Sequence, residues 1–78
     1  DWQVHVYGVA SDALSAWCRA VGLPLRVFGW EPAHERAGLA CDAAYLVRPD
    51  GYVALAEAEG TPEALQRYFR ELGYFRFL

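Results

Sequence analysis

The chain has 78 residues, 55% of them hydrophobic, and a formal net charge of −3. This length suits one domain, and the hydrophobic content excludes a disordered segment. The acidic balance argues against nucleic-acid and anionic-membrane partners, because phosphate binding needs clustered Lys and Arg. No apolar run approaches the roughly 20 residues that a membrane-spanning helix needs.

The first part of the chain predicts a strand, a helix and a second strand. Residues Gln3 to Val9 alternate between apolar and polar, which is typical of a strand. Ser11 or Asp12 is expected to cap a helix that Gly22 ends. Its apolar stripe follows helical spacing and consists of Leu14, Trp17, Cys18 and Val21. Residues Leu25 to Phe28 should form a strand parallel to the first, with a right-handed crossover.

The segment from Gly29 to Asp42 has no clear periodicity. Pro32 and Gly38 interrupt any long helical pattern, and most of the intervening side chains are polar. We expect a loop that contains a short helix around residues 33–37.

A β-hairpin is predicted from two apolar runs, residues 44–48 and 52–58, that flank a turn. Pro49 fixes its own φ, Asp50 can bond the backbone two residues on, and Gly51 can adopt positive φ. Arg48 and Asp50 can be read in two ways. They can pair with a partner surface, or they can simply serve the turn, with Arg48 an exposed strand residue; the second reading is favoured.

The last predicted helix begins near residue 61, with Thr61 as N-cap and Pro62 at the first helical position. Its apolar stripe comprises Leu65, Phe69 and Leu72. On its solvent-exposed face we expect the i,i+4 ion pairs Glu63–Arg67 and Arg67–Glu71. Gly73 ends the helix. Three apolar runs therefore lie between the two long helices. This count favours a thioredoxin-like α/β fold, a β-α-β unit joined to a β-β-α unit in a four-stranded mixed sheet.

Few residues suggest chemistry. A redox-active thioredoxin-like domain needs two cysteines, two residues apart, where the first strand meets the first helix, and this chain has Val9-Ala10-Ser11-Asp12 there. Cys18 reads as a buried structural thiol, and a bond between Cys18 and Cys41 stays open. The metal-capable side chains lack the paired spacing of a metal site: Glu31, His34, Glu35 and Cys41. We expect no catalytic, cofactor-binding or metal-binding residue.

The hairpin carries a family resemblance in the motif Leu46-Val47-Arg48-Pro49-Asp50-Gly51-Tyr52-Val53-Ala54. It resembles the C-terminal domain of FAD-dependent aromatic-ring hydroxylases, flavoprotein monooxygenases of the phenol hydroxylase and polyketide hydroxylase type. The order of elements extends the likeness over most of the chain, but only the hairpin is specific. Leu55-Ala56 replaces the Trp and Arg that often follow in that family.

The resemblance implies a non-catalytic thioredoxin-like domain, residues 1–78, that forms the C-terminal part of a larger oxidoreductase. FAD and NAD(P)H would be bound by the parent protein, not by this segment. Its partners would be the N-terminal FAD-binding and substrate domains, with dimerisation or another homo-oligomer as a further role. The alternative is a free-standing thioredoxin-like binding module without redox activity. The absence of a targeting signal favours a cytoplasmic location.

The C-terminal residues are unusually apolar for a chain end, where polar residues are usual. They can pack on the domain itself or form part of a docking face. The candidate docking face comprises Trp30, Tyr68, Tyr74, Phe75 and Phe77.

Overall fold

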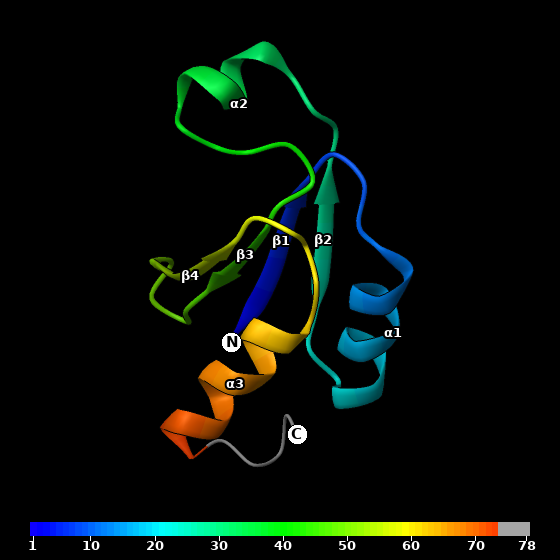
Figure 1. Ribbon diagram of the computed structural model, residues 1–78. Coiled ribbons are helices and arrows are strands. Elements are labelled where there is room, and N and C mark those ends of the chain that lie inside the picture. The colour runs from blue at the N-terminus through cyan, green and yellow to red at the C-terminus, as the bar shows by residue number, and fades with distance from the viewer. Residues whose placement is uncertain (74–78) are drawn as a thin grey trace.

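The computed structural model describes residues 1–73 of the chain, which form seven elements (Figure 1). In chain order these are β1 (Gln3–Tyr7), α1 (Asp12–Val21), β2 (Leu25–Phe28), α2 (Pro32–Arg36), β3 (Ala44–Val47), β4 (Val53–Glu57) and α3 (Glu63–Leu72). The sequence predicted each of them to within a few residues. Within residues 1–73, no helix combines the length and apolar character that crossing a membrane requires.

The strands form one mixed sheet in the order β2-β1-β3-β4. β1 runs parallel to β2, as the predicted crossover requires, and antiparallel to β3. β3 and β4 form the predicted antiparallel hairpin, with a register irregularity between Leu46 and Val47. The chain is therefore a small α/β domain with a four-stranded mixed sheet and helices, as predicted.

The hydrophobic core lies between one face of the sheet and the helices α1 and α3. Alternation along β1 sends Val4 and Val6 to this face, and both are fully buried. The fully or almost fully buried residues that complete the core come from α1, the α1–β2 connection, β3 and α3: Leu14, Cys18, Leu23, Ala44, Leu46, Leu65 and Phe69. Trp17 and Val21 pack against it from the predicted α1 stripe and are partly buried.

Two predictions for the last helix are wrong. Thr61 does not cap α3, because its N–H and hydroxyl both donate to Oε2 of Glu57, at 3.2 and 3.0 Å. A carboxylate is a stronger acceptor than the competing groups of a helix end, and Pro62 takes the N-cap position. Leu72 is 51% exposed, since the last turn of α3 extends past the sheet (Figure 1).

The ion pairs predicted for Arg67 also do not form. Within residues 1–73, the one ion pair joins Arg48 and Asp50. Exposed pairs between long side chains gain little over hydration, so their absence costs the helix only a few tenths of a kcal/mol.

Candidate functional site

Three connections of the chain meet at Asp42, next to the N-terminus of α1. They are the β1–α1 connection (residues 8–11), Asp42 itself before β3, and the turn at Gly60 before α3. We call this meeting point the Asp42 junction. Asp42 donates its N–H to the carbonyl of Tyr7 at 2.9 Å, and its Oδ1 accepts the N–H of Val9 at 2.6 Å. Asp42 thus ties its own segment to the end of β1.

Ser11 links the junction to α3. Its hydroxyl donates to the carbonyl of Gly60 at 2.9 Å and accepts the N–H of Leu14 at 3.1 Å. The predicted N-cap is therefore confirmed, and the same oxygen also holds a residue 49 positions away in the sequence. Both hydrogen-bonding roles of this hydroxyl are structural.

The junction requires unusual backbone conformations. Asp42 has φ of 66°, the left-handed region that side chains other than Asn and Asp rarely enter. Gly60 has φ of 68°, and a Cβ there would lie 2.6 Å from the carbonyl oxygen of Asp42. A residue with a side chain at position 60 would be strained by the positive φ and would clash with the backbone of Asp42. The three connections therefore pack together at close range.

Neither thiol is activated. Cys18 is 2% exposed, and burial raises its pKa to about 11. Cys41 is exposed beside the junction, and its Sγ lies 3.4 Å from Oδ1 of Asp42. Local desolvation, then the hydrogen bond to Asp42 and the charge of that carboxylate, raise the pKa of Cys41. Both cysteines are free, which confirms Cys18 as a buried thiol. Because the thiolate is the nucleophile, both environments disfavour thiol chemistry.

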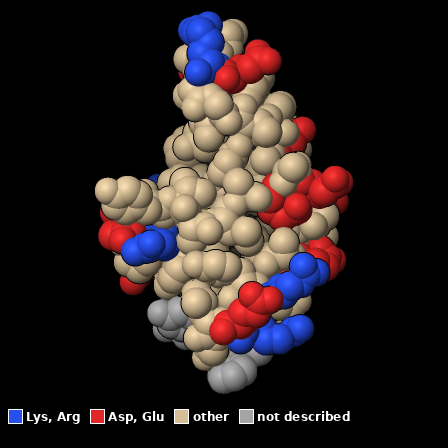
Figure 2. All heavy atoms as spheres, turned by 60° about the vertical axis from the view of Figure 1, so that its left-hand side comes forward, with Lys and Arg blue, Asp and Glu red and all other residues tan. Residues whose placement is uncertain are grey.

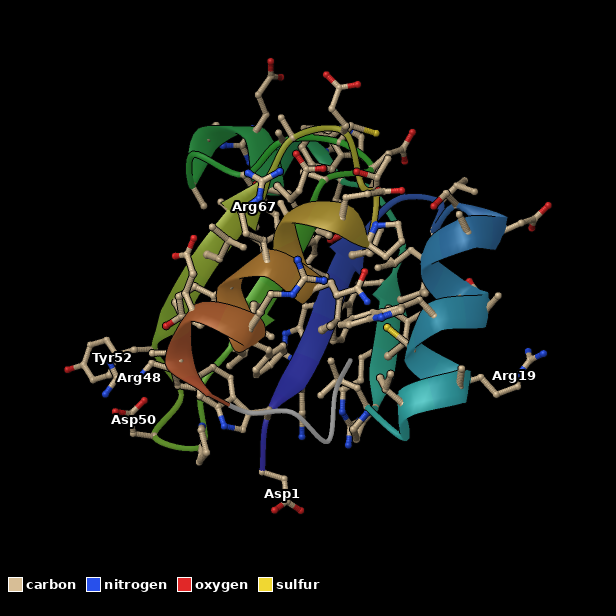
Figure 3. All side chains as sticks on the ribbon, turned by 60° about the horizontal axis from the view of Figure 1, so that its bottom comes forward. Asp1, Arg19, Arg48, Asp50, Tyr52 and Arg67 are labelled. Atoms are coloured by element: carbon tan, nitrogen blue, oxygen red, sulfur yellow. The ribbon has the colours of Figure 1, made fainter. Side chains whose placement is uncertain are left out.

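The hairpin turn has the geometry that the sequence predicted. Gly51 has φ of 91°, and its N–H donates to the carbonyl of Arg48 at 2.9 Å. Oδ1 of Asp50 accepts the N–H of Tyr52 at 3.1 Å, while Oδ2 pairs with Nη2 of Arg48 at 2.6 Å. Figure 3 shows Arg48, Asp50 and Tyr52 together at the tip of the hairpin. Arg48 and Asp50 are about half exposed and pair with each other across the turn.

The sheet face opposite the core carries a feature that the sequence analysis missed. On this face the Tyr7 ring stacks on Phe28, with centroids 5.0 Å apart and planes 19° apart. His34 of α2 contacts Tyr7 at 4.8 Å, and the Tyr45 ring lies edge-on at 6.1 Å. Alternation along β1 places His5 and Tyr7 on one face. Only the pairing of β1 with β2 and β3 adds Phe28 and Tyr45 to them.

A short polar network adjoins these aromatic rings. Oε1 of Gln3 lies 2.9 Å from Nε2 of His5 and accepts Nε–H of Arg26 at 3.2 Å. Partial burial, and then the positive charge of Arg26, lower the pKa of His5. Arg26 is exposed. A guanidinium thus lies over the sheet beside an imidazole that is held towards its neutral form.

The metal-capable residues of the β2–β3 connection do not converge. Over the described range, no group of three or more His, Cys, Asp or Glu side chains is placed to hold a metal ion. His34 Nδ1 accepts the N–H of Glu31 at 3.2 Å, which completes the N-terminus of α2. His34 is thus engaged in a capping interaction.

The residues of the candidate docking face fall on different segments. Trp30 lies against His34 of α2, with ring centroids 5.6 Å apart. Tyr68 of α3 lies against Trp2 and Phe69. Figure 1 shows α2 and α3 near opposite ends of the domain. The remaining residues of this face lie outside the described range: Tyr74, Phe75 and Phe77. The docking face as a whole stays a prediction.

One side of the domain presents a broad uncharged surface. Figure 2 brings the left-hand side of Figure 1 forward and shows acidic and basic side chains mainly around the periphery. Tyr52, just before β4, and Val53, its first residue, are among the most exposed apolar residues, at 71% and 55%.

Comparison of the chain with known family models, with curated proteins and with solved structures gives no match.

Proposed function

We propose that this chain is the non-catalytic, thioredoxin-like C-terminal domain of an FAD-dependent aromatic-ring hydroxylase, with a structural or association role. The parent's N-terminal FAD-binding and substrate domains carry the catalytic residues and bind FAD and NAD(P)H. The sheet order β2-β1-β3-β4 supports this proposal, because joining a parallel β-α-β unit to an antiparallel β-β-α unit yields that order. The motif of the resemblance forms an intact hairpin around the Arg48–Asp50 pair.

The Asp42 junction is the observation that carries the proposal. In a redox-active thioredoxin-like domain, the attacking thiol lies between the first strand and the first helix. Here the Val9 N–H binds the Asp42 carboxylate, and the Ser11 hydroxyl binds Gly60 and caps α1. The Val9 N–H and the Ser11 hydroxyl are thus engaged in holding the three connections together. A scaffold role uses both of these groups, whereas neither is left to act on a substrate.

The natural polypeptide that contains this chain provides the test. We expect a protein of several hundred residues with a Gly-rich dinucleotide-binding motif near its start, which purifies with bound FAD and oxidises NAD(P)H when an aromatic substrate is added. Deletion of these 78 residues should leave the bound flavin in place and change the oligomeric state or the melting temperature. A natural polypeptide without flavin would contradict the proposal.

The second candidate, a free-standing thioredoxin-like binding module, is favoured by the sheet face opposite the core. Phe28 on this face is 39% exposed, and α1 and α3 both pack on the other face. A natural product of about the length of this chain, with no flavin, would support the module over the hydroxylase domain. In either case we propose a cytoplasmic location, in keeping with the two free cysteines.

A further inference from the structure

β2 is an edge strand whose outer side presents free backbone groups. The carbonyls of Pro24 and Phe28 accept the N–H groups of Val4 and Gly8, so these two residues face β1. Because backbone direction alternates along a strand, Leu25 and Val27 direct their N–H and C=O groups away from β1. Among residues 1–73, no strand pairs with this side. Such a row of groups is a template for another strand.

The other edge strand is less suited to pairing. β4 has a register irregularity opposite Leu46 and Val47, and irregularities of this kind twist an edge away from partners. It also contacts α3. β2, in contrast, keeps regular pairing with β1 over all four of its residues.

The apolar side chains of β2 are open on both faces of the sheet. Val27 pairs with buried Val6 and so belongs to the face that α1 covers, yet it is 52% exposed. In Figure 1, the arrowhead of β2 extends past the end of α1. Phe28 pairs with Tyr7 on the opposite face and is 39% exposed. An added strand would cover apolar area on both faces.

Arg26 gives this edge its charge. A charged residue on an edge strand discourages pairing with a strand that does not offer the opposite charge. The Arg26 side chain lies across the sheet, where its Nε–H donates to Oε1 of Gln3 at 3.2 Å. The ion pair of the described chain lies elsewhere, between Arg48 and Asp50. Among residues 1–73, no carboxylate therefore pairs with the positive charge of Arg26 on this edge strand.

We propose that the β2 edge binds an extended segment of a partner protein that places a carboxylate beside Arg26 and apolar side chains beside Val27 and Phe28. Main-chain hydrogen bonds to Leu25 and Val27 would supply affinity, and alternate side chains would supply selectivity. Opposite charges on neighbouring strands favour each other. The C-terminal residues of this chain fit poorly, because their charged residue is Arg76, of the same sign as Arg26. The inference does not depend on the proposed parent enzyme.

A synthetic nine-residue peptide tests this site: alternating threonine and valine with one central glutamate, against the same peptide with lysine in its place. When the glutamate peptide is titrated into the protein, amide NMR should show that the N–H groups of Leu25 and Val27 become protected from exchange. The glutamate peptide should bind at least tenfold more tightly than the lysine peptide. Arg26→Gln should remove this difference, while the control Arg19→Gln, on an exposed position of α1, should keep it.

A second variant tests the backbone contribution. Val27→Pro deletes an N–H that faces away from β1, so the ladder to β1 is preserved and binding should be lost. Melting of each variant establishes that it is folded. The proposal is overturned if neither peptide binds at millimolar concentration or if both bind equally. Protection at β4 instead of β2, or sedimentation showing a dimer formed through β2, would overturn it as well.

Discussion

The β3–β4 turn and the Asp42 junction both pass through left-handed backbone, but they differ in what they need from the rest of the chain. At the turn, Gly51 has φ of 91°, and a Cβ would meet nothing within 4 Å. At the junction, Gly60 has φ of 68°, and a Cβ would lie 2.6 Å from the backbone of Asp42. The turn is built from neighbours in sequence, whereas the junction joins three distant segments. A substitution that alters the backbone should therefore destabilise the domain less at Gly51 than at Gly60.

The same substitution at both glycines measures this difference. Gly51→Ala should lower the free energy of unfolding by about 1 kcal/mol, from backbone strain alone. Gly60→Ala should lower it by roughly 2–4 kcal/mol, because it adds a clash with a backbone atom to similar strain. Urea unfolding of the two variants and the wild type gives both values. Equal losses at the two positions would show that the junction is no more tightly packed than the turn.

Three substitutions at Asp42 separate the contribution of its side-chain hydrogen bond from the cost of its left-handed backbone conformation. Asp42→Ala should cost about 1–2 kcal/mol, because it loses the acceptor for the Val9 N–H and leaves a strained residue at φ of 66°. Asp42→Gly should cost less, since glycine adopts this φ freely. Asp42→Asn should cost least, because it keeps an acceptor and tolerates the conformation. Equal losses for the Ala and Gly variants would mean that the backbone there is unstrained.

The contrast also explains what could be predicted from the sequence. The hairpin turn rests on the neighbouring residues Pro49, Asp50 and Gly51, so its positive φ and its Asp50 hydrogen bond were predictable from residue types. The α1 stripe follows from helical spacing, and most of the fold follows from the order of the apolar runs.

The candidate site was not predictable in the same way. The bond from Val9 to Asp42 spans 33 positions, and no local pattern marks either residue as its partner. Thr61 looked like an N-cap because propensity favours it there, but Glu57 competes for its donors once β4 and α3 are in place. Phe28 joins Tyr7 only through strand pairing. In each case the outcome depends on a tertiary contact that the local sequence does not show.

The stability of the turn that contains Gly60 should decrease at acidic pH, because this turn is held by the carboxylate of Glu57. Desolvation acts to raise the pKa of Glu57, but hydrogen bonds from Thr61 and the backbone of Glu59 outweigh it and lower the pKa below the ordinary 4.5. The carboxylate form therefore stabilises the fold at neutral pH, and this contribution disappears as the pH falls through the lowered pKa. Glu57→Gln should cost about 0.5 kcal/mol at pH 7, because water screens this site.

Urea unfolding of Glu57→Gln and the wild type at pH 7 and at pH 3 checks this expectation. The difference between the two proteins should shrink at the lower pH, where a larger fraction of Glu57 is protonated. If the difference in unfolding free energy is the same at both pH values, the loss comes from altered packing and not from the charge of Glu57.

The smallest effect is expected at the Arg48–Asp50 pair of the hairpin. Arg48→Ala should change the free energy of unfolding by less than about 0.5 kcal/mol, because the two side chains are 49% and 46% exposed. The backbone bonds of the turn and the bond from Tyr52 to Asp50 do not involve the guanidinium. Any loss should vanish in 1 M salt, where charges are screened beyond about 3 Å. Arg19→Ala on α1 is the matched control for removing a positive charge from this acidic chain. A loss above 1 kcal/mol that persists in salt would show that Arg48 supports the hairpin through packing, and the turn would then rely on its surroundings as the junction does.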